Sequence, residues 1–236
     1  MIRRVVAEAL GTAFLLAAII GSGIMGERLA GGNVAVALLA NTIATGAALV
    51  ALILTFGPIS GAHLNPAVTL ADAFQGGLAW RDVPAYIAAQ TIGAFAGVAA
   101  AHLMFGQPLF SASRHVRAGS PQLLSEFIAT FGLLSVIWGC SRSRSSAVPF
   151  AVGAYITAAY WFTSSTSFAN PAVTLARAAS DTFSGIRPAD ASGFISAQLA
   201  GAVAATLLFR WLVPSLPKDA FNVVVPHSRH GTTHAR

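Results

Sequence analysis

The sequence predicts an all-α membrane protein with six transmembrane helices and two re-entrant half-helices, arranged as an inverted 3+3 repeat. Composition is the first observation: 55% of the 236 residues are hydrophobic, only 9% are charged, and the mean hydropathy is +0.68. Soluble domains carry about 25% charged residues. The second observation is six apolar stretches long enough to span a bilayer. The third is one seven-residue phrase, Asn-Pro-Ala-Val-Thr-Leu-Ala, that occurs at 65–71 and again at 170–176.

The apolar stretches account for the predicted full crossings. A hydrocarbon core about 30 Å thick needs roughly 20 apolar residues of helix. In chain order, the six stretches lie at about 5–25, 34–56, 83–105, 123–139, 147–162 and 192–213. The fifth is the shortest, and a duplicated phrase lies between the second and third stretches and again between the fifth and sixth.

Each duplicated phrase predicts the start of a short helix. Asn is a good helix N-cap, and Pro is favoured at the first helical position. The apolar run that begins at Asn65 reaches only Gly76, and the one that begins at Asn170 reaches only Asp181. At ~1.5 Å per residue, ten or eleven residues cover roughly 15–17 Å, about half of the hydrocarbon core. We therefore expect two half-length helices that meet in the middle of the membrane.

Other residues repeat in step with the duplicated phrase. Glu8 opens the first stretch and Glu126 the fourth, while Gln90 in the third stretch corresponds to Gln198 in the sixth. Each copy contains three full crossings, an odd number, so the second copy enters the membrane from the opposite face. The sequence thus predicts one transmembrane domain at 1–217, with repeat 1 at about 1–107 and repeat 2 at about 121–217, followed by a polar tail at 218–236.

The basic residues predict the orientation. If the N-terminus is inside, the inner side holds nine of them: Arg3, Arg4, Arg81, Arg142, Arg144, Arg210, Lys218, Arg229 and Arg236. The other side holds five: Arg28, Arg114, Arg117, Arg177 and Arg187. The excess of positive charge favours cytoplasmic N- and C-termini. The basic residues are scattered, which argues against a nucleic-acid partner despite the net charge of +6, and the histidine-containing tail is interpreted as solvated rather than as a metal site.

The non-helical segments before the two phrases predict a water-filled path through the membrane domain. Backbone that is not helical cannot face lipid, so residues 57–64 and 163–169 must be buried in protein or line a water-filled lumen. Asn65 and Asn170 can cap their helices through the carboxamide oxygen and still offer NH₂ donors to that lumen. The positive helix ends at the same place disfavour protons and cations.

Two carboxylates within apolar stretches, Glu8 and Glu126, need partners. One interpretation is a proton relay. The other is that each carboxylate accepts hydrogen bonds from loop backbone and holds the loop in place. We favour the second, because the pair is duplicated with the repeat and no membrane-embedded base accompanies it; Gln90 and Gln198 receive the same interpretation.

The motifs resemble the signature of the major intrinsic protein family, the aquaporins and aquaglyceroporins. The resemblance rests on Ser-Gly-Ala-His-Leu-Asn-Pro-Ala-Val-Thr at 60–69 and on the second Asn-Pro-Ala, and it covers nearly the whole chain. It implies six spans and two half-helices, a pore in each subunit of a homotetramer, passive conduction of water or small neutral solutes, and no cofactor, metal or enzymatic activity. The implied pore residues are the two motifs, Asn65, Pro66, Ala67, Asn170, Pro171 and Ala172, and the loop residues Gly61, Ala62, His63, Leu64, Thr166, Phe168 and Ala169.

The resemblance also implies a four-position selectivity filter. Counting from the motifs places it at Thr45, Ala158, Ser167 and Val173, with Thr157 as the alternative to Ala158. The family usually has an arginine at the last position and an aromatic residue at the first, and neither appears here. We therefore expect a wide opening with few donors that passes polyols. The Val173 sequence is similar to bacterial channels linked to arsenic resistance, which implies undissociated arsenite and organoarsenicals as cargo.

Arg177 stands four residues beyond Val173, on the same helix face. It is either a displaced cationic gatepost at the pore mouth or the partner of Asp181 in an i,i+4 ion pair. We favour the ion pair. Asp72 occupies the matching position of the first half-helix and suggests paired structural charges.

Two other function classes compete with a channel. A secondary transporter also uses inverted repeats with broken helices, but it usually needs a coupling-ion site, and apart from the Glu pair no intramembrane acid cluster is visible. A membrane enzyme is excluded because no Ser-His-Asp set, metal-ligand spacing or phosphate loop occurs at membrane depth, and His63 and His102 lie in different elements. The expected location is a bacterial inner membrane, with the lipid bilayer and small neutral solutes as partners.

Overall fold

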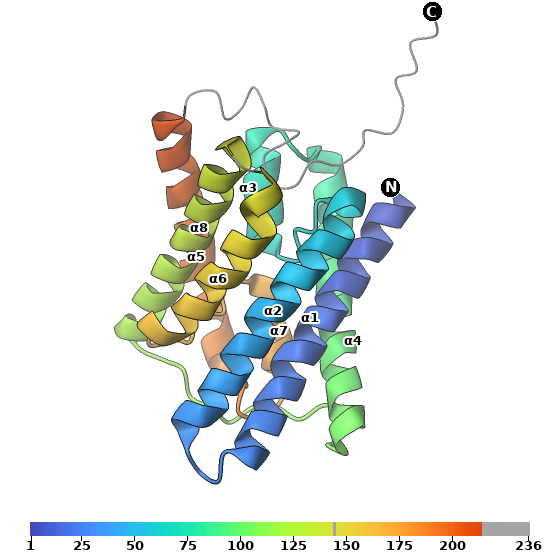
Figure 1. The fold of residues 1–236 in the computed structure, drawn as a ribbon, viewed down its shortest axis with the longest axis vertical. Coiled ribbons are helices and arrows are strands. Elements are labelled where there is room, and N and C mark those ends of the chain that lie inside the picture. The colour runs from blue at the N-terminus through green and yellow to red at the C-terminus, as the bar shows by residue number, and fades with distance from the viewer. Residues whose placement is uncertain (144, 214–236) are drawn as a thin grey trace, which may run out of the picture.

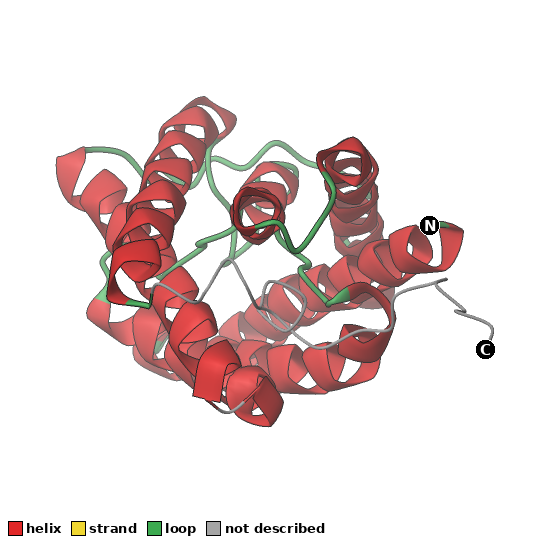
Figure 2. Cartoon of the chain, turned by 90° about the horizontal axis from the view of Figure 1, so that it is seen from above, coloured by secondary structure: helices red, strands yellow, loops and turns green. Residues whose placement is uncertain are grey.

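A computed structural model describes residues 1–143 and 145–213. All regular elements in these ranges are helices (Figure 2). In chain order they are α1 (Ile2–Leu29), α2 (Val34–Ser60), α3 (Pro66–Gln75), η1 (Trp80–Asp82), α4 (Val83–Phe105), α5 (Ser120–Ser143), η2 (Ser145–Ala147), α6 (Val148–Phe162), α7 (Pro171–Arg177) and α8 (Pro188–Leu212). The tail predicted at 218–236, with His227, His230 and His234, lies outside the described residues, as does Arg144.

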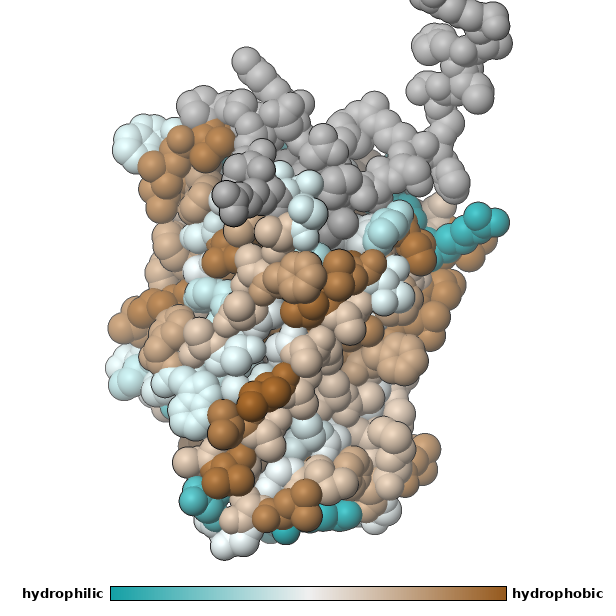
Figure 3. All heavy atoms as spheres, in the orientation of Figure 1, coloured by the Kyte–Doolittle hydropathy of each residue, from teal (hydrophilic) through white to brown (hydrophobic). Residues whose placement is uncertain are grey.

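The long helices have the length and composition of membrane spans. Five of them, namely α1, α2, α4 together with η1, α5 and α8, are long and apolar enough to cross a bilayer. The 15 residues of α6 extend roughly 22 Å at about 1.5 Å per residue. Hydrophobic side chains cover the side of the molecule seen in Figure 3, and strongly hydrophilic ones gather at its lower end and near its upper right. The arrangement confirms six long helices and two short ones, α3 and α7.

The two halves of the chain pack in the same way. In the first half α1 packs against α2 and α4, and in the second half α5 packs against α6 and α8 (Figure 1). Contacts between α2 and α6 join the halves, and the short helices α3 and α7 touch each other as well as α4 and α8. The inverted repeat therefore places both half-helices inside a shell of six long helices.

Glycines let the long helices approach closely. A Cβ on Gly93 of α4 would meet the carbonyl oxygen of Ala9 in α1, and a Cβ on Gly97 would meet that of Ala13. Gly201 of α8 approaches the carbonyl oxygen of Phe127 in α5 in the same manner. Such small-residue contacts are typical of membrane helices, where packing rather than water exclusion drives association.

Two element boundaries differ from the sequence prediction. Residues 57–60 belong to α2, so the first non-helical segment begins at Gly61, which caps α2 in the left-handed region at φ 91°. The second half-helix, α7, ends at Arg177 instead of continuing toward Asp181, because the Arg177 carbonyl accepts hydrogen bonds from the Ser180 and Ile186 amides and the chain turns back. The second half-helix is therefore shorter than the first, with 7 residues against 10.

Candidate functional site

The site lies where the two half-helices begin. The Asn65 side-chain oxygen accepts a hydrogen bond from the Ala67 amide at 2.9 Å. The Asn170 oxygen accepts from the Ala172 amide at 3.0 Å and from the Val173 amide at 3.2 Å. Each asparagine is thus the N-cap of its helix, and the capping prediction is confirmed.

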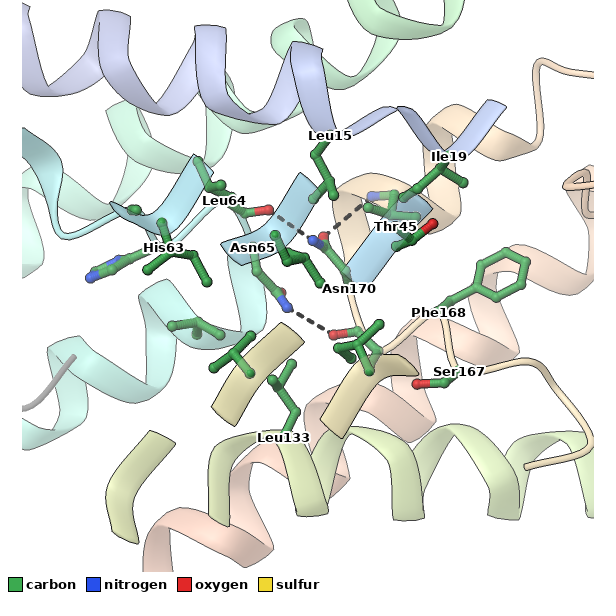
Figure 4. Close-up of a pocket in the computed structure, with 18 of the residues that line it drawn as sticks. Leu15, Ile19, Thr45, His63, Leu64, Asn65, Leu133, Ser167, Phe168 and Asn170 are labelled. Carbon is green, nitrogen blue, oxygen red and sulfur yellow. Dashed lines mark hydrogen bonds between the residues drawn. The ribbon is translucent and has the colours of Figure 1, made fainter. Parts of the chain in front are cut away.

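The same asparagines join the two repeats. The Asn65 Nδ2 atom donates to the Ala169 carbonyl at 2.8 Å, and the Asn170 Nδ2 atom donates to the Leu64 carbonyl at 2.8 Å (Figure 4). A carboxamide nitrogen has two hydrogens, so one hydrogen on each asparagine remains for a solute. Both asparagines line a cavity, as the sequence predicts.

The two loops that lead into the half-helices have left-handed backbone at non-glycine residues. In the first loop Ala62 and Leu64 have φ values of 47° and 49°. In the second, Thr166, Ser167 and Ala169 have φ values of 60°, 50° and 49°. Each such conformation costs about 1–3 kcal/mol for a residue with a side chain, so these loops need support from their surroundings.

Glu8 supplies this support to the first loop. Its Oε1 atom accepts from the Ser60 hydroxyl at 2.6 Å and from the His63 amide at 3.0 Å. Its Oε2 atom accepts from the Leu64 amide and from Gln90 Nε2, both at 2.7 Å. The carboxylate is fully buried, and every one of these donors stabilises its charge.

Glu126 does the same for the second loop. It accepts from the Phe168 and Ala169 amides, both at 2.9 Å, and from Gln198 Nε2 at 2.6 Å. Gln198 also donates to Thr174, as Gln90 does to Thr69, both at 2.9 Å. The interpretation of the two glutamates as loop anchors is confirmed.

The cavity passes beside the asparagine pair. Figure 4 shows His63 on one side of the pair and Ser167 and Phe168 on the other. The water-accessible volume is about 60 Å³, which at roughly 10–15 Å³ per water holds on the order of four to six molecules. The walls contributed by the long helices are mostly apolar: Leu15, Ile19, Thr45, Leu49, Ile53, Leu133, Ile137, Val148, Val152, Ile156 and Tyr160.

Of the predicted filter residues, Thr45, Ser167 and Val173 line the cavity, but Ala158 does not. Ala158 is exposed on the outer side of α6. The residues of α6 that line the cavity are spaced by four: Val148, Val152, Ile156 and Tyr160. Two residues along a helix turn the side chain by about 200°, so Ala158 faces away from the lumen. The assignment of Ala158 to the filter is wrong, and the alternative Thr157 is also absent from the lining, because its hydroxyl donates to the Gly153 carbonyl and packs against Gly46.

Tyr160 is the residue that the sequence reasoning missed. It lies on the cavity wall, and its hydroxyl donates to Thr45 Oγ1 at 3.3 Å. The spacing of four that begins at Val148 is the signal that identifies it. Phe168 and Arg177 also line the cavity. With a phenol hydroxyl and a guanidinium on the wall, the expectation of few donors is wrong, and the width of the opening stays a prediction.

Arg177 does not pair with Asp181, so that prediction is wrong. The Arg177 Nε atom donates to the Ser184 carbonyl, and its guanidinium carbon lies 3.3 Å from the centroid of the Phe168 ring. Asp181 instead accepts from Arg114 Nε at 2.8 Å. The chain turns after Arg177, which removes Asp181 from the helical i+4 position.

Asp72, the counterpart of Arg177 in the first half-helix, contacts a histidine. Its Oδ2 atom lies 3.4 Å from His63 Nε2, and both side chains are buried. The His63 Nδ1 atom is 3.1 Å from Thr69 Oγ1. The two matching positions therefore have different partners: Asp72 contacts the imidazole of His63, and Arg177 contacts the phenyl ring of Phe168.

The segment 107–119, which connects the repeats, covers the second loop. Arg117 Nε donates to the Gly185 carbonyl at 2.8 Å, and Arg117 Nη1 donates to the Ser165 carbonyl at 3.1 Å. Its guanidinium carbon lies 5.1 Å from the Phe168 centroid. Burial lowers the pKa of His115 below its usual 6.5, and the nearby positive charges of Arg117 and Arg177 lower it further. Within the described residues, no group of three or more His, Cys, Asp or Glu is placed to hold a metal ion.

Comparisons with known proteins agree with this geometry. A family model described as "Major intrinsic protein" matches residues 1–164 and 141–235. "Aquaglyceroporin AqpS" of Rhizobium meliloti (strain 1021) is 58% identical over 216 residues, which cover 91% of this chain and 92% of that protein. "Aquaporin NIP1-3" of Oryza sativa subsp. japonica is 38% identical over 184 residues, 73% of this chain and 62% of that protein. The X-ray structure of the aquaglyceroporin from Plasmodium falciparum has a similar fold, with a TM-score of 0.72 at 22% identity, covering 91% of this chain and 98% of that chain.

Proposed function

Because the chain belongs to the major intrinsic protein family, we propose that it is a passive transmembrane channel for small uncharged solutes, with water and glycerol-like polyols as the solute class. The observation that carries the proposal is the cavity beside the reciprocal Asn65–Asn170 hydrogen bonds. It lies inside an integral membrane protein, at the point where both half-helices begin.

The cavity suits an uncharged solute that carries hydroxyl groups. One side presents carboxamide hydrogens from Asn65 and Asn170, and the long helices present mostly apolar side chains on the other sides. A polyol can direct its hydroxyls to the polar side and its carbon chain to the apolar walls. A cation loses its hydration shell here without gaining a pairing charge, which is costly in a low dielectric.

A coupled transporter is the rival function. Coupling to a proton or cation gradient requires an ionisable group that can exchange its partner during transport. Glu8 and Glu126 are instead fully buried and accept hydrogen bonds from two loop amides each. Using either as a relay would release the loop that forms the path, which favours the passive channel.

The finer solute range includes undissociated arsenite and other neutral hydroxylated solutes. Arsenite at neutral pH is an uncharged triol of similar shape to glycerol. The residue after the second Asn-Pro-Ala is Val173, a small apolar side chain that lines the cavity. We expect Val173→Arg to reduce polyol and arsenite flux while sparing water, because the longer side chain narrows the path.

The proposed assembly is a homotetramer in a bacterial plasma membrane, with both termini in the cytoplasm. The single channel domain at 1–217 provides one pore per subunit. The excess of Lys and Arg on the N-terminal side, nine residues against five, supports this orientation. Exposed apolar side chains on the long helices, such as Phe14, Ile92 and Trp211, suit contacts with lipid or with neighbouring subunits.

Stopped-flow light scattering of proteoliposomes tests the function. We expect the full chain to raise water, glycerol and arsenite permeability above that of empty liposomes, with flux that rises linearly with the solute gradient. The flux is expected to be the same with and without a sodium or proton gradient. Saturable flux that depends on an ion gradient would instead establish the transporter.

A further inference from the structure

We propose that Arg177 is a specificity-determining residue of the channel, which places a fixed positive charge and a hydrogen-bond donor in the conduit one helical turn beyond Val173. The inference rests on the proposed channel function. The sequence favours an ion pair of Arg177 with Asp181 over a charge at the pore mouth, and the contacts of Arg177 in the structure reverse that preference. We call the part of the cavity that Arg177 lines the Tyr160 end. Its residues are Thr45, Tyr160, Ser167, Phe168 and Arg177.

Two polar atoms at the Tyr160 end lack hydrogen-bond partners among the described residues. They are Arg177 Nη1 and Ser167 Oγ, both buried. Arg177 is 1% exposed and Ser167 is 2% exposed, and both residues line the cavity. More than about 90% of buried polar groups in proteins are hydrogen-bonded, so two unpaired atoms on one cavity indicate that water or a solute supplies the missing partner.

The Arg177 side chain is held in place by the rest of its contacts. Nε donates to the Ser184 carbonyl, and the guanidinium lies over the Phe168 ring. Phe168 is itself anchored, because its amide donates to Glu126 and its ring packs edge-on against Phe194. These contacts fix the plane of the guanidinium, so that Nη1 is a preorganised donor rather than a mobile one.

The charge of Arg177 is not neutralised by an ion pair. No Asp or Glu in residues 1–143 and 145–213 forms a salt bridge with it, and Asp181 is engaged by Arg114. Arg117 adds a second positive charge, because its guanidinium carbon lies 5.1 Å from the centroid of the same Phe168 ring. A cation that passes within about 5 Å of one such charge, at an effective dielectric constant of about 20, is disfavoured by a factor on the order of a hundred.

The chemistry suits a solute with hydroxyl oxygens. Arg177 Nη1 can only donate, so it requires an oxygen acceptor, while the Ser167 hydroxyl can donate or accept. A polyol offers both kinds of group on adjacent carbons. Its carbon chain then lies against Val173 and the ring of Tyr160, which also line the cavity.

The test compares substitutions that separate charge from size. Wild-type chain, Arg177→Gln, Arg177→Lys and Arg177→Ala are reconstituted in vesicles that contain a pH-sensitive dye. Proton leak and glycerol flux are measured on the same preparations. Arg114→Ala is the matched control, since Arg114 is an exposed arginine outside the cavity lining and contacts the loop after α7.

We expect Arg177→Gln and Arg177→Ala to raise the proton leak on the order of a hundredfold per unit of glycerol permeability, while Arg177→Lys and Arg114→Ala stay at the wild-type leak. If the Ala variant does not reconstitute, the Gln and Lys pair carries the comparison. Arg177→Gln vesicles that conduct glycerol and remain as proton-tight as wild type overturn the inference and leave the channel function intact. Wild-type vesicles that conduct no glycerol overturn the channel function itself.

Discussion

The loop before Asn65 and the loop before Asn170 share one plan and differ in charge. Each is anchored by a buried glutamate through two backbone amides, and each ends in an asparagine that caps a helix and donates to the other loop. The residue two before the asparagine is His63 in the first loop and Phe168 in the second. The residue seven after it is Asp72 in the first half and Arg177 in the second.

This difference separates the parts of the site that both repeats share from the parts that occur in one repeat. In the first half His63 and Asp72 contact each other and form a local polar pair. In the second half Phe168 contacts Arg177 through its ring and brings no negative charge. The shared anchors create the path, and the unequal pairs make one end of the path more positive than the other.

The largest effect is expected from the shared anchors. Glu8→Ala and Glu126→Ala each leave two loop amides without an acceptor, at about 1–3 kcal/mol for each orphaned group. We expect either change to lower the free energy of unfolding by about 2–6 kcal/mol, and Glu8→Ala by the larger amount because it also removes the acceptor of the 2.6 Å hydrogen bond from the Ser60 hydroxyl. Unfolding of the full chain in detergent measures this. The exposed Glu27→Ala is the control, and an anchor variant as stable as that control contradicts the account.

The next largest effect on stability is expected from the His63–Asp72 pair of the first half. His63→Phe copies the second loop into the first and leaves the buried Asp72 without its ring partner. Removing one partner of a buried pair costs about 3–5 kcal/mol. We expect Asp72→Asn to recover much of this loss in the double variant, because the amide carries no charge. Unfolding measurements on the double-mutant cycle test the coupling, and strictly additive effects would show that the pair has no energetic link.

The Phe168 ring of the second half is expected to contribute less to the free energy of unfolding. Phe168→Leu removes the aromatic face from Arg177 and Arg117. A desolvated cation–π contact contributes about 2 kcal/mol, so we expect a loss of stability near that value. Phe194→Leu removes the ring pair with Phe168 but keeps both cation contacts, and the loss is expected to be smaller. Equal losses in the two variants would contradict a special role of the cations.

The smallest effect concerns pH and the segment over the second loop. The pKa of His115 is lowered below 6.5 in the folded chain by burial and by the two arginines. The unfolded chain therefore takes up a proton first, and stability is full above about pH 6.5 and falls as the pH drops below it. Because the desolvation of His115 is only partial and much of the residue is exposed, we expect a loss of less than about 1 kcal/mol. Denaturant titration at pH 7 and pH 5 is expected to show this loss in wild type but not in His115→Gln; an equal loss in both contradicts the assignment.

Sequence predicted the shared parts of the site and missed the specific ones. Duplicated phrases and the matched Glu and Gln positions carry strong local signals, so caps, anchors and half-helices followed from helix-capping and burial rules. The partners of Arg177 depend on how the chain turns after α7 and on the nearby Phe168 ring. The partner of Asp72 is the His63 ring. No local sequence rule predicts either set of contacts. Counting back from Asn170 to Ala158 failed because a residue count does not fix which face of α6 a side chain takes, and the lining residues Ile156 and Tyr160 lie on either side of Ala158 in the sequence.

A pair of substitutions two residues apart on α6 shows whether solutes pass through the cavity beside the asparagine pair. Ile156 lines this cavity, whereas Ala158 is exposed on the opposite side of the same helix. Stopped-flow glycerol permeability is measured on proteoliposomes that contain equal amounts of Ile156→Trp or Ala158→Trp chains. The account predicts background permeability for Ile156→Trp and wild-type permeability for Ala158→Trp. Glycerol flux that survives in Ile156→Trp would place the path elsewhere and contradict the account.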